Sequence, residues 1–275
     1  SDSNDYSVTS GSFGGSYALT DNLTLASNIG RGFRAPTLFE LHADGVHAGV
    51  AAVQKGNDDL DAEKSLNTDL SLRWRSHQTS ASVTVYRNAI DNYIYLHDTG
   101  NTQDALPVFQ YQQTDAVLTG VELTARAQMT ETLELSTTYS AVDGENDQTG
   151  EDLPLQPADE LLVEGTWTPG NWGWARSPYI RLGLRHNASR EAAPGEPFAQ
   201  FDNAPFGTAS TDAYTVADLA LGFSVDGVTG APMRFSLEVR NLTDKTYRDF
   251  LDTYKGYALS PGRDVRMTLR VPLGG

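Results

Sequence analysis

The feature that most constrains this chain is an alternation of polar and apolar residues with a period of two. It is clearest in SLNTDLSLRW, GVELTARAQM and DVRMTLRVPL, which are spread along the chain. Successive side chains of a β-strand point to opposite faces of its sheet, so each segment predicts a strand with one apolar and one polar face. No segment keeps a helical period. The sequence therefore predicts an all-β fold.

The lengths of the connections decide which kind of β-protein fits. A soluble sandwich packs its apolar face on a second sheet, whereas an outer-membrane barrel turns that face to lipid and lines its lumen with the polar one. Short connections at 20–22, 76–79, 130–132, 169–177 and 226–232 alternate with long polar ones at 31–64, 96–107, 143–159, 189–212 and 251–262. Barrels alternate periplasmic turns with extracellular loops in this way. We therefore expect an antiparallel transmembrane β-barrel segment.

About eleven strands are expected. Their predicted ranges are 4–19, 23–30, 65–75, 80–95, 108–129, 133–142, 160–168, 178–188, 213–225, 233–250 and 263–273. Several are longer than strands of soluble proteins, as tilted membrane-spanning strands must be. Tyr and Trp residues recur near the predicted strand ends, among them Trp74, Trp167, Trp172 and Trp174. The sequence thus predicts an aromatic girdle at the membrane interface.

Composition excludes other classes. The formal net charge of −16 argues against nucleic-acid binding through phosphate neutralisation. The chain has no cysteine, so it can form neither disulfides nor thiolate metal sites. No apolar run is long enough for a transmembrane helix.

Two anchors more than 200 positions apart carry a family resemblance. RGFRAPTLFEL followed by GNDDLDAEKSLNTDLSLRW resembles the mid-barrel segment of TonB-dependent outer-membrane receptors. VRNLTDKTYRDF and the later KGYALSPGRDVRMTLRVPL resemble the C-terminal end of those receptors. The resemblance implies a bacterial outer-membrane barrel of 22 strands filled by an N-terminal plug. It also implies uptake of a scarce or chelated nutrient, driven by the TonB inner-membrane complex.

Residues 1–275 would then be the C-terminal half of that barrel, without the plug and the N-terminal strands. Eleven alternating strands begin and end in the same direction, so a missing half of eleven strands would pair antiparallel with both edges. We expect the partners to be that N-terminal half with its plug, in the same or a companion chain, the TonB complex, and lipid and lipopolysaccharide. In the RGFRAP stretch, Arg31 and Arg34 would pair with lumen carboxylates or lipopolysaccharide phosphate, and the stretch itself is interpreted as structural.

The loop ELHADGVHAG holds the candidate ligands. Glu40, His42, Asp44 and His47 lie close together in sequence, with His97 as a distant candidate near the same rim. Imidazole and carboxylate suit zinc or copper(II), which makes His42 and His47 candidate metal ligands. The zinc- and copper-receptor branch of the family has a similar stretch, although Val46 here precedes the histidine where that branch has a second one. The alternative is that both histidines are ordinary surface residues.

The transported ligand therefore stays open between zinc or copper, a siderophore and haem, with no cofactor required. An acidic loop at 143–154 also allows a calcium interpretation, without EF-hand spacing. Catalytic motifs are sparse: GFSVD fails the nucleophile-elbow pattern at its last position, and no HExxH or P-loop occurs. We expect no enzyme. The alternative class is a secreted soluble β-protein that binds or hydrolyses polysaccharide.

Overall fold

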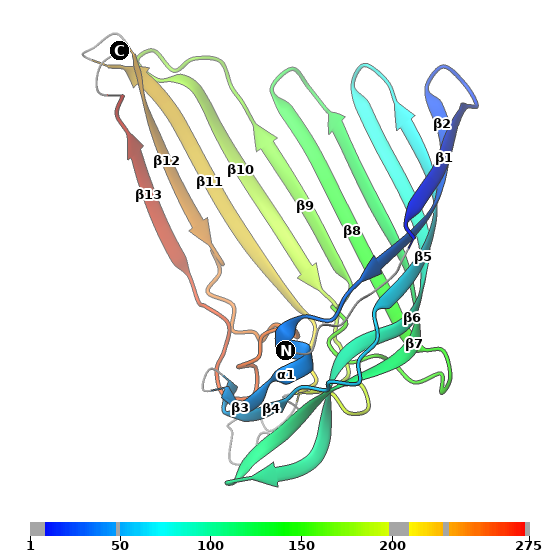
Figure 1. Ribbon diagram of the computed structural model, residues 1–275. Helices are drawn as coiled ribbons and strands as arrows, with labels where there is room; N and C mark the ends of the chain where they lie inside the picture. The colour runs from blue at the N-terminus through cyan, green and yellow to red at the C-terminus, as the bar shows by residue number, and fades with distance from the viewer. Residues whose placement is uncertain (1–8, 48–49, 198–208, 228–230, 273–275) are drawn as a thin grey trace.

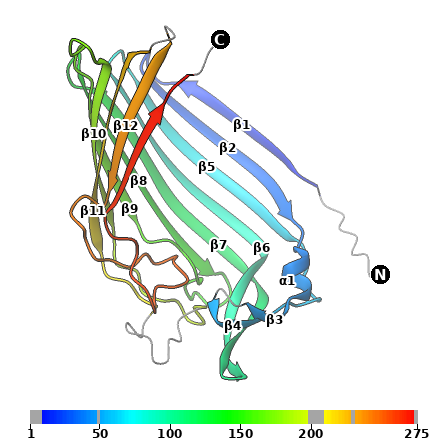
Figure 2. The same ribbon diagram turned by 90° about the vertical axis from the view of Figure 1, so that its left-hand side faces the viewer.

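The computed structural model describes residues 9–47, 50–197, 209–227 and 231–272, and its main feature is one antiparallel sheet. Eleven strands pair with their neighbours in chain order and curve into an open trough (Figures 1 and 2). The strands along this path are β1 (Gly11–Ala18), β2 (Leu23–Arg34), β5 (Glu63–Arg75), β6 (Thr79–Gln103), β7 (Leu106–Gln128), β8 (Leu133–Asn146), β9 (Glu160–Trp167), β10 (Arg176–Asn187), β11 (Tyr214–Asp226), β12 (Pro232–Arg240) and β13 (Asp264–Arg270). The predicted eleven-stranded all-β fold is confirmed. Residues 4–8 and 273 of the predicted terminal strands lie outside the described residues.

The two ends of the trough differ as the connection lengths predict. The hairpins β1–β2, β5–β6, β7–β8, β9–β10 and β11–β12 close at one end, which we call the turn end (top of Figure 1). The longer connections gather at the opposite end, the loop end (bottom of Figure 1). Within the described residues, β1 pairs only with β2 and β13 only with β12. Both edges of the trough are therefore open.

The two faces of the sheet are inverted relative to a soluble protein. On β5, Leu70 is 45% exposed and its neighbour Ser71 only 2%. Ser71 shares a hydrogen bond with Thr84 of β6 (2.8 Å), one of several polar contacts along what we call the polar face. Apolar side chains cover the other, apolar face, and no layer of the described residues packs on them. Such a face needs a lipid environment rather than water.

The apolar cores of the described residues lie at the loop end. One groups Leu96 of β6 and Phe109 of β7 with Ala52 and Ala209. The other groups Leu41, Leu60 and Ile94. The loops are thus folded into a body of their own around the projecting ends of β6 and β7.

Two predicted loops contain regular structure. The prediction of a loop at 96–107 is wrong, because β6 and β7 continue through this range. They are joined by a two-residue turn at Asp104 and Ala105, both with positive φ (53° and 63°). Register shifts between Ile90 and Tyr93 and between Asp98 and Thr102 break the alternation there, which hid the strands.

The 31–64 loop contains α1 (Leu38–His42), β3 (Asp44–His47) and β4 (Ala52–Lys55), and β4 pairs in parallel with β7. No described helix has the length and apolar character needed to cross a membrane.

The predicted strand 233–250 is also wrong beyond Arg240. Asn241 adopts a positive φ (47°) and its amide donates to Asp218 (2.8 Å). Its side chain accepts from the Lys245 amide (2.7 Å) and donates to the carbonyls of Lys245 (2.8 Å) and Pro261 (3.4 Å). The NLTDK stretch is therefore a hydrogen-bonded turn that ends β12 and fixes the start of the last loop.

Aromatic side chains collect at the turn end. Trp167 lies 6.1 Å from Trp172 between ring centroids, and Trp174 makes an edge contact with Phe223 at 5.1 Å. Trp174 is 71% exposed. This arrangement agrees with the predicted aromatic girdle.

Candidate functional site

Arg34 organises the first part of the loop end. Its guanidinium donates to both carboxylate oxygens of Glu63 (2.7 Å each) and to both of Glu40 (2.9 and 2.8 Å). Thr37 caps α1 in a reciprocal capping box with Glu40. Burial alone would raise the pKa of Glu40, but the hydrogen bonds from Arg34 and Thr37 hold that pKa below its usual value. The structural interpretation of RGFRAP is supported, with Arg34 paired to carboxylates.

The candidate ligands of this loop, of which His42 and His47 are the predicted metal ligands, differ in their surroundings. The Glu40 carboxylate is engaged by Arg34 and Thr37, whereas His42, Asp44 and His47 are exposed on α1 and β3. In the described ranges, no three His, Asp or Glu side chains form a group that could hold a metal ion. The metal role of His42 and His47 stays a prediction.

His97 lies inside the loop body. Its ring makes an edge contact with Tyr95, and Gly195 of the 188–213 connection lies directly against it. Gly195 has a positive φ (66°) and leaves no room for a Cβ atom, while its carbonyl accepts from the Asp98 amide (3.1 Å). His97 Nδ1 is buried without a hydrogen-bond partner in the described structure. The structure thus places His97 beneath a loop.

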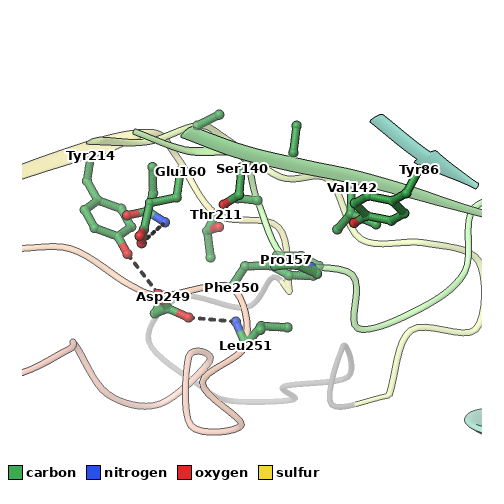
Figure 3. A pocket seen from close by; sticks show the side chains of 14 residues that line it. Tyr86, Ser140, Val142, Pro157, Glu160, Thr211, Tyr214, Asp249, Phe250 and Leu251 are labelled. Atoms are coloured by element: carbon green, nitrogen blue, oxygen red, sulfur yellow. Dashed lines mark hydrogen bonds between the residues drawn. The ribbon is translucent and has the colours of Figure 1, made fainter. Parts of the chain in front are cut away.

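A pocket of about 310 Å³ opens on the polar face at the loop end. Tyr86 and Tyr214 lie at its opposite ends, with Ser140, Glu160 and Thr211 between them, and Asp249, Phe250 and Leu251 face them from the last loop (Figure 3). Its volume is at the lower end of the range of small-molecule sites. This pocket is the candidate binding site.

One cross-strand row forms the wall of the pocket. Ser140 pairs with Glu160, Glu160 with Asn187, and Asn187 with Tyr214, so four neighbouring strands each contribute one residue. All four belong to the polar face. The row places a hydroxyl, a carboxylate, an amide and a phenol side by side at the level where the strands meet the loops.

Tyr86 reaches the pocket because Gly120 lies opposite it on β7. A Cβ atom at Gly120 would overlap the Tyr86 ring and lie 2.7 Å from the Ala141 carbonyl oxygen. The absence of a side chain at Gly120 therefore lets the ring lie across β7. Gly120 is a positioning residue for Tyr86.

The last loop is held against the wall by Tyr214. Its hydroxyl donates to Asp249 (2.8 Å), and its ring lies 4.3 Å from the Tyr247 centroid. Asp249 also accepts from the Leu251 amide (2.9 Å). The carboxylate of Asp249 is thus oriented from two sides at the mouth of the pocket.

A buried ion pair joins three loops behind the pocket. Lys255 Nζ lies 3.9 Å from Glu196, and both side chains are 1% exposed. Lys255 also donates to the Phe250 carbonyl (2.6 Å) and lies 3.7 Å above the Phe250 ring. Glu196 accepts from the Leu155 amide (3.1 Å). We call Lys255, Glu196 and Phe250 the loop latch.

The pocket residues were not among the candidates predicted from sequence. The sequence contained part of the information, because alternation places Glu160, Asn187 and Tyr214 on the polar face at strand ends. Only the register of the sheet, however, brings them into one row. Asp249 fell within a predicted strand, which concealed its place in the loop.

The match to a known family covers most of the chain. A family described as "TonB dependent receptor-like, beta-barrel" matches residues 1–242. The ferric enterobactin receptor of Pseudomonas aeruginosa is 29% identical over 171 residues, which are 55% of this chain and 23% of that protein. The vitamin B12 transporter BtuB of Photobacterium profundum is 25% identical over 234 residues, 84% of this chain and 33% of that protein.

A solved structure shows the same fold. The copper transporter OprC superposes with a TM-score of 0.72 at 21% identity, over 92% of this chain and 38% of OprC. The chain therefore spans less than half the length of these proteins, whose names are those of receptors and transporters. With the family match, the open eleven-stranded trough and its lipid-type outer face, the chain belongs to the TonB-dependent receptor-like β-barrel family of the bacterial outer membrane.

Proposed function

We propose that this chain is the C-terminal half-barrel of an outer-membrane receptor that imports a scarce metal or metal chelate, energised through TonB. The observation that carries the proposal is the pocket on the polar face beneath the loops. In a closed barrel that face lines the lumen, so a ligand that passes the loops from outside would meet the pocket. Receptors for ferric enterobactin, vitamin B12 and copper among the relatives support this class of cargo.

The open edges support a partner in the same barrel. Unpaired backbone groups on β1 and β13 would each cost several kcal/mol in lipid. An N-terminal barrel half carrying a plug would satisfy both edges. Residues 1–275 are thus proposed as one part of a longer receptor or of a two-chain assembly.

The proposal is tested by uptake in bacteria that express the intact receptor. We expect import of a labelled nutrient, drawn from ferric siderophores, haem, cobalamin, copper and zinc, to require TonB. Ser140→Phe should block import by filling the pocket. Val163→Phe, the same side chain placed on the apolar face of β9, should leave import unchanged. TonB-independent import, or equal import by both variants, would refute the proposal.

A further inference from the structure

The acidic residues of the chain are concentrated at the loop end. Segments 35–62, 91–115, 143–159, 188–213 and 241–263 contain 22 of the 36 Asp and Glu residues but only 6 of the 20 Lys and Arg residues. The remaining residues contain 14 of each sign. The whole formal charge of −16 therefore belongs to these segments, whose described residues lie at the loop end, and the rest of the chain is neutral as a set.

Half of the six basic residues are engaged within the protein. Lys255 is buried in the loop latch. Arg248 donates to the carbonyls of Lys255 and Ser210 (3.1 Å each), and Arg190 lies 4.0 Å from Asp143 with only 19% of its side chain exposed. These cations hold the loops together and contribute little to the recognition of an incoming anion.

The pocket itself shows the same excess of acidic over basic residues. None of the described residues that line it is Lys, Arg or His, whereas Glu160 and Asp249 both face it. The nearest cation to Glu160 is Arg185 (4.0 Å), which also lies 3.8 Å from Asp218 and so is shared between two carboxylates.

An unsatisfied acceptor completes the wall. Asn187 is 8% exposed and lines the pocket between Glu160 and Tyr214. Its amide nitrogen donates to Glu160 (3.4 Å), but its Oδ1 atom is buried without a partner in the described structure. A buried acceptor without a donor is costly, and a ligand that donates a hydrogen bond would remove that cost.

We propose that this pocket, within the receptor function proposed above, selects a ligand that presents a cationic hydrogen-bond donor, such as an amino or guanidino group. Glu160 and Asp249 supply the charge, and Asn187 Oδ1 supplies an acceptor. Hydrogen bonds to charged groups are stronger than neutral ones. An anionic chelate would meet repulsion from the loops at long range and from the two carboxylates at short range.

The test uses one chelate whose charge is varied at a single group. Ferric desferrioxamine B carries a free terminal amine and is cationic, its N-acetyl derivative is neutral, and its N-succinyl derivative is anionic. Binding to the purified intact receptor is measured in low and physiological salt, with ferric enterobactin as a further anionic probe. We expect the cationic form to bind about tenfold more tightly than the neutral form, the anionic forms more weakly still, and the differences to shrink with salt.

Isosteric variants locate the effect. Glu160→Gln and Asp249→Asn should each reduce the preference for the cationic form several-fold. Glu164→Gln lies on the same strand and face but outside the pocket, and should keep the full preference. Because two carboxylates are tested separately, a folding defect in one variant leaves the other decisive.

The outcomes separate this inference from the proposed function. If the receptor imports a nutrient through TonB but binds the anionic forms at least as tightly as the cationic one, the inference is wrong and the function stands. The same holds if an importing receptor binds no member of the series. If no nutrient of the uptake panel is imported through TonB, the proposed function fails, and the inference fails with it.

Discussion

Removing the cation of the loop latch should release the loops without opening the barrel. In Lys255→Met the Glu196 carboxylate would stay 1% exposed and lose its counterion, keeping the hydrogen bond from Leu155. Breaking a buried ion pair by removing one partner costs about 3–5 kcal/mol. If that cost falls on local opening, amide protection in the 241–263 segment and at Leu155 should fall by about two to four orders of magnitude.

The loss of protection in Lys255→Met should depend on pH, in a direction set by the pKa of Glu196. Burial raises the pKa of Glu196, although the Leu155 amide and the charge of Lys255 oppose the rise. A carboxyl whose pKa is higher in the folded state binds protons more tightly when folded. It therefore stabilises fully below its unfolded pKa, and that stabilisation is lost as pH rises through the folded pKa. The defect of Lys255→Met should thus be largest near neutral pH and shrink on acidification.

Hydrogen–deuterium exchange by mass spectrometry on the intact receptor would measure both effects, after correction for the intrinsic pH dependence of exchange. Lys245→Met, in the same loop with an exposed side chain, is the matched control and should leave protection unchanged. The double variant Lys255→Met with Glu196→Gln should recover most of the protection, because no charge is then buried alone and the Leu155 amide keeps an acceptor. Equal exchange in Lys255→Met and the parent receptor, or a defect that grows at low pH, would refute the reasoning.

Three further predictions concern single positions. Gly120→Ala should displace the ring of Tyr86 and so weaken the free energy of ligand binding by about 1–3 kcal/mol. Gly15→Ala, where no atom lies within 4 Å of the added Cβ, is the control and should leave binding unchanged. Ligand titration of both variants measures the difference. Asn241→Ala should lower protection of the last loop by about 1–3 kcal/mol, measured by amide exchange, because it leaves partly buried backbone groups unpaired. Replacing His42 and His47 together by Ala should abolish growth under zinc or copper limitation if they bind metal; unchanged growth would end that interpretation.

The sequence was sufficient for the architecture because both of its signals are local. Alternation assigned each strand its faces, and connection length separated the two ends. Prediction from the sequence failed where the backbone departs from regular strand pairing. Asp104 and Ala105 turn the long β6–β7 hairpin without the glycine that usually marks such a turn, and Asn241 ends β12 through side-chain hydrogen bonds.

The candidate site was harder to predict for a physical reason. Histidines such as His42 stand out in a sequence because of their chemistry, whereas Glu160 and Asn187 are ordinary strand-end residues until pairing aligns them. Register across several hairpins sets that alignment, and no single segment contains it. Glu40 shows the converse case: its chemistry suggests a ligand, but the structure uses its carboxylate to bind Arg34.

The separation of charge between loops and strands also bears on how such a protein can vary. Because the chain outside the loop-end segments is neutral as a set, a substitution that changes a loop charge alters the net charge of the protein without adding or removing a charge in the membrane-spanning wall. Related receptors would then differ most in the sign and number of their loop charges, and a comparison of strains would reveal adaptation there first.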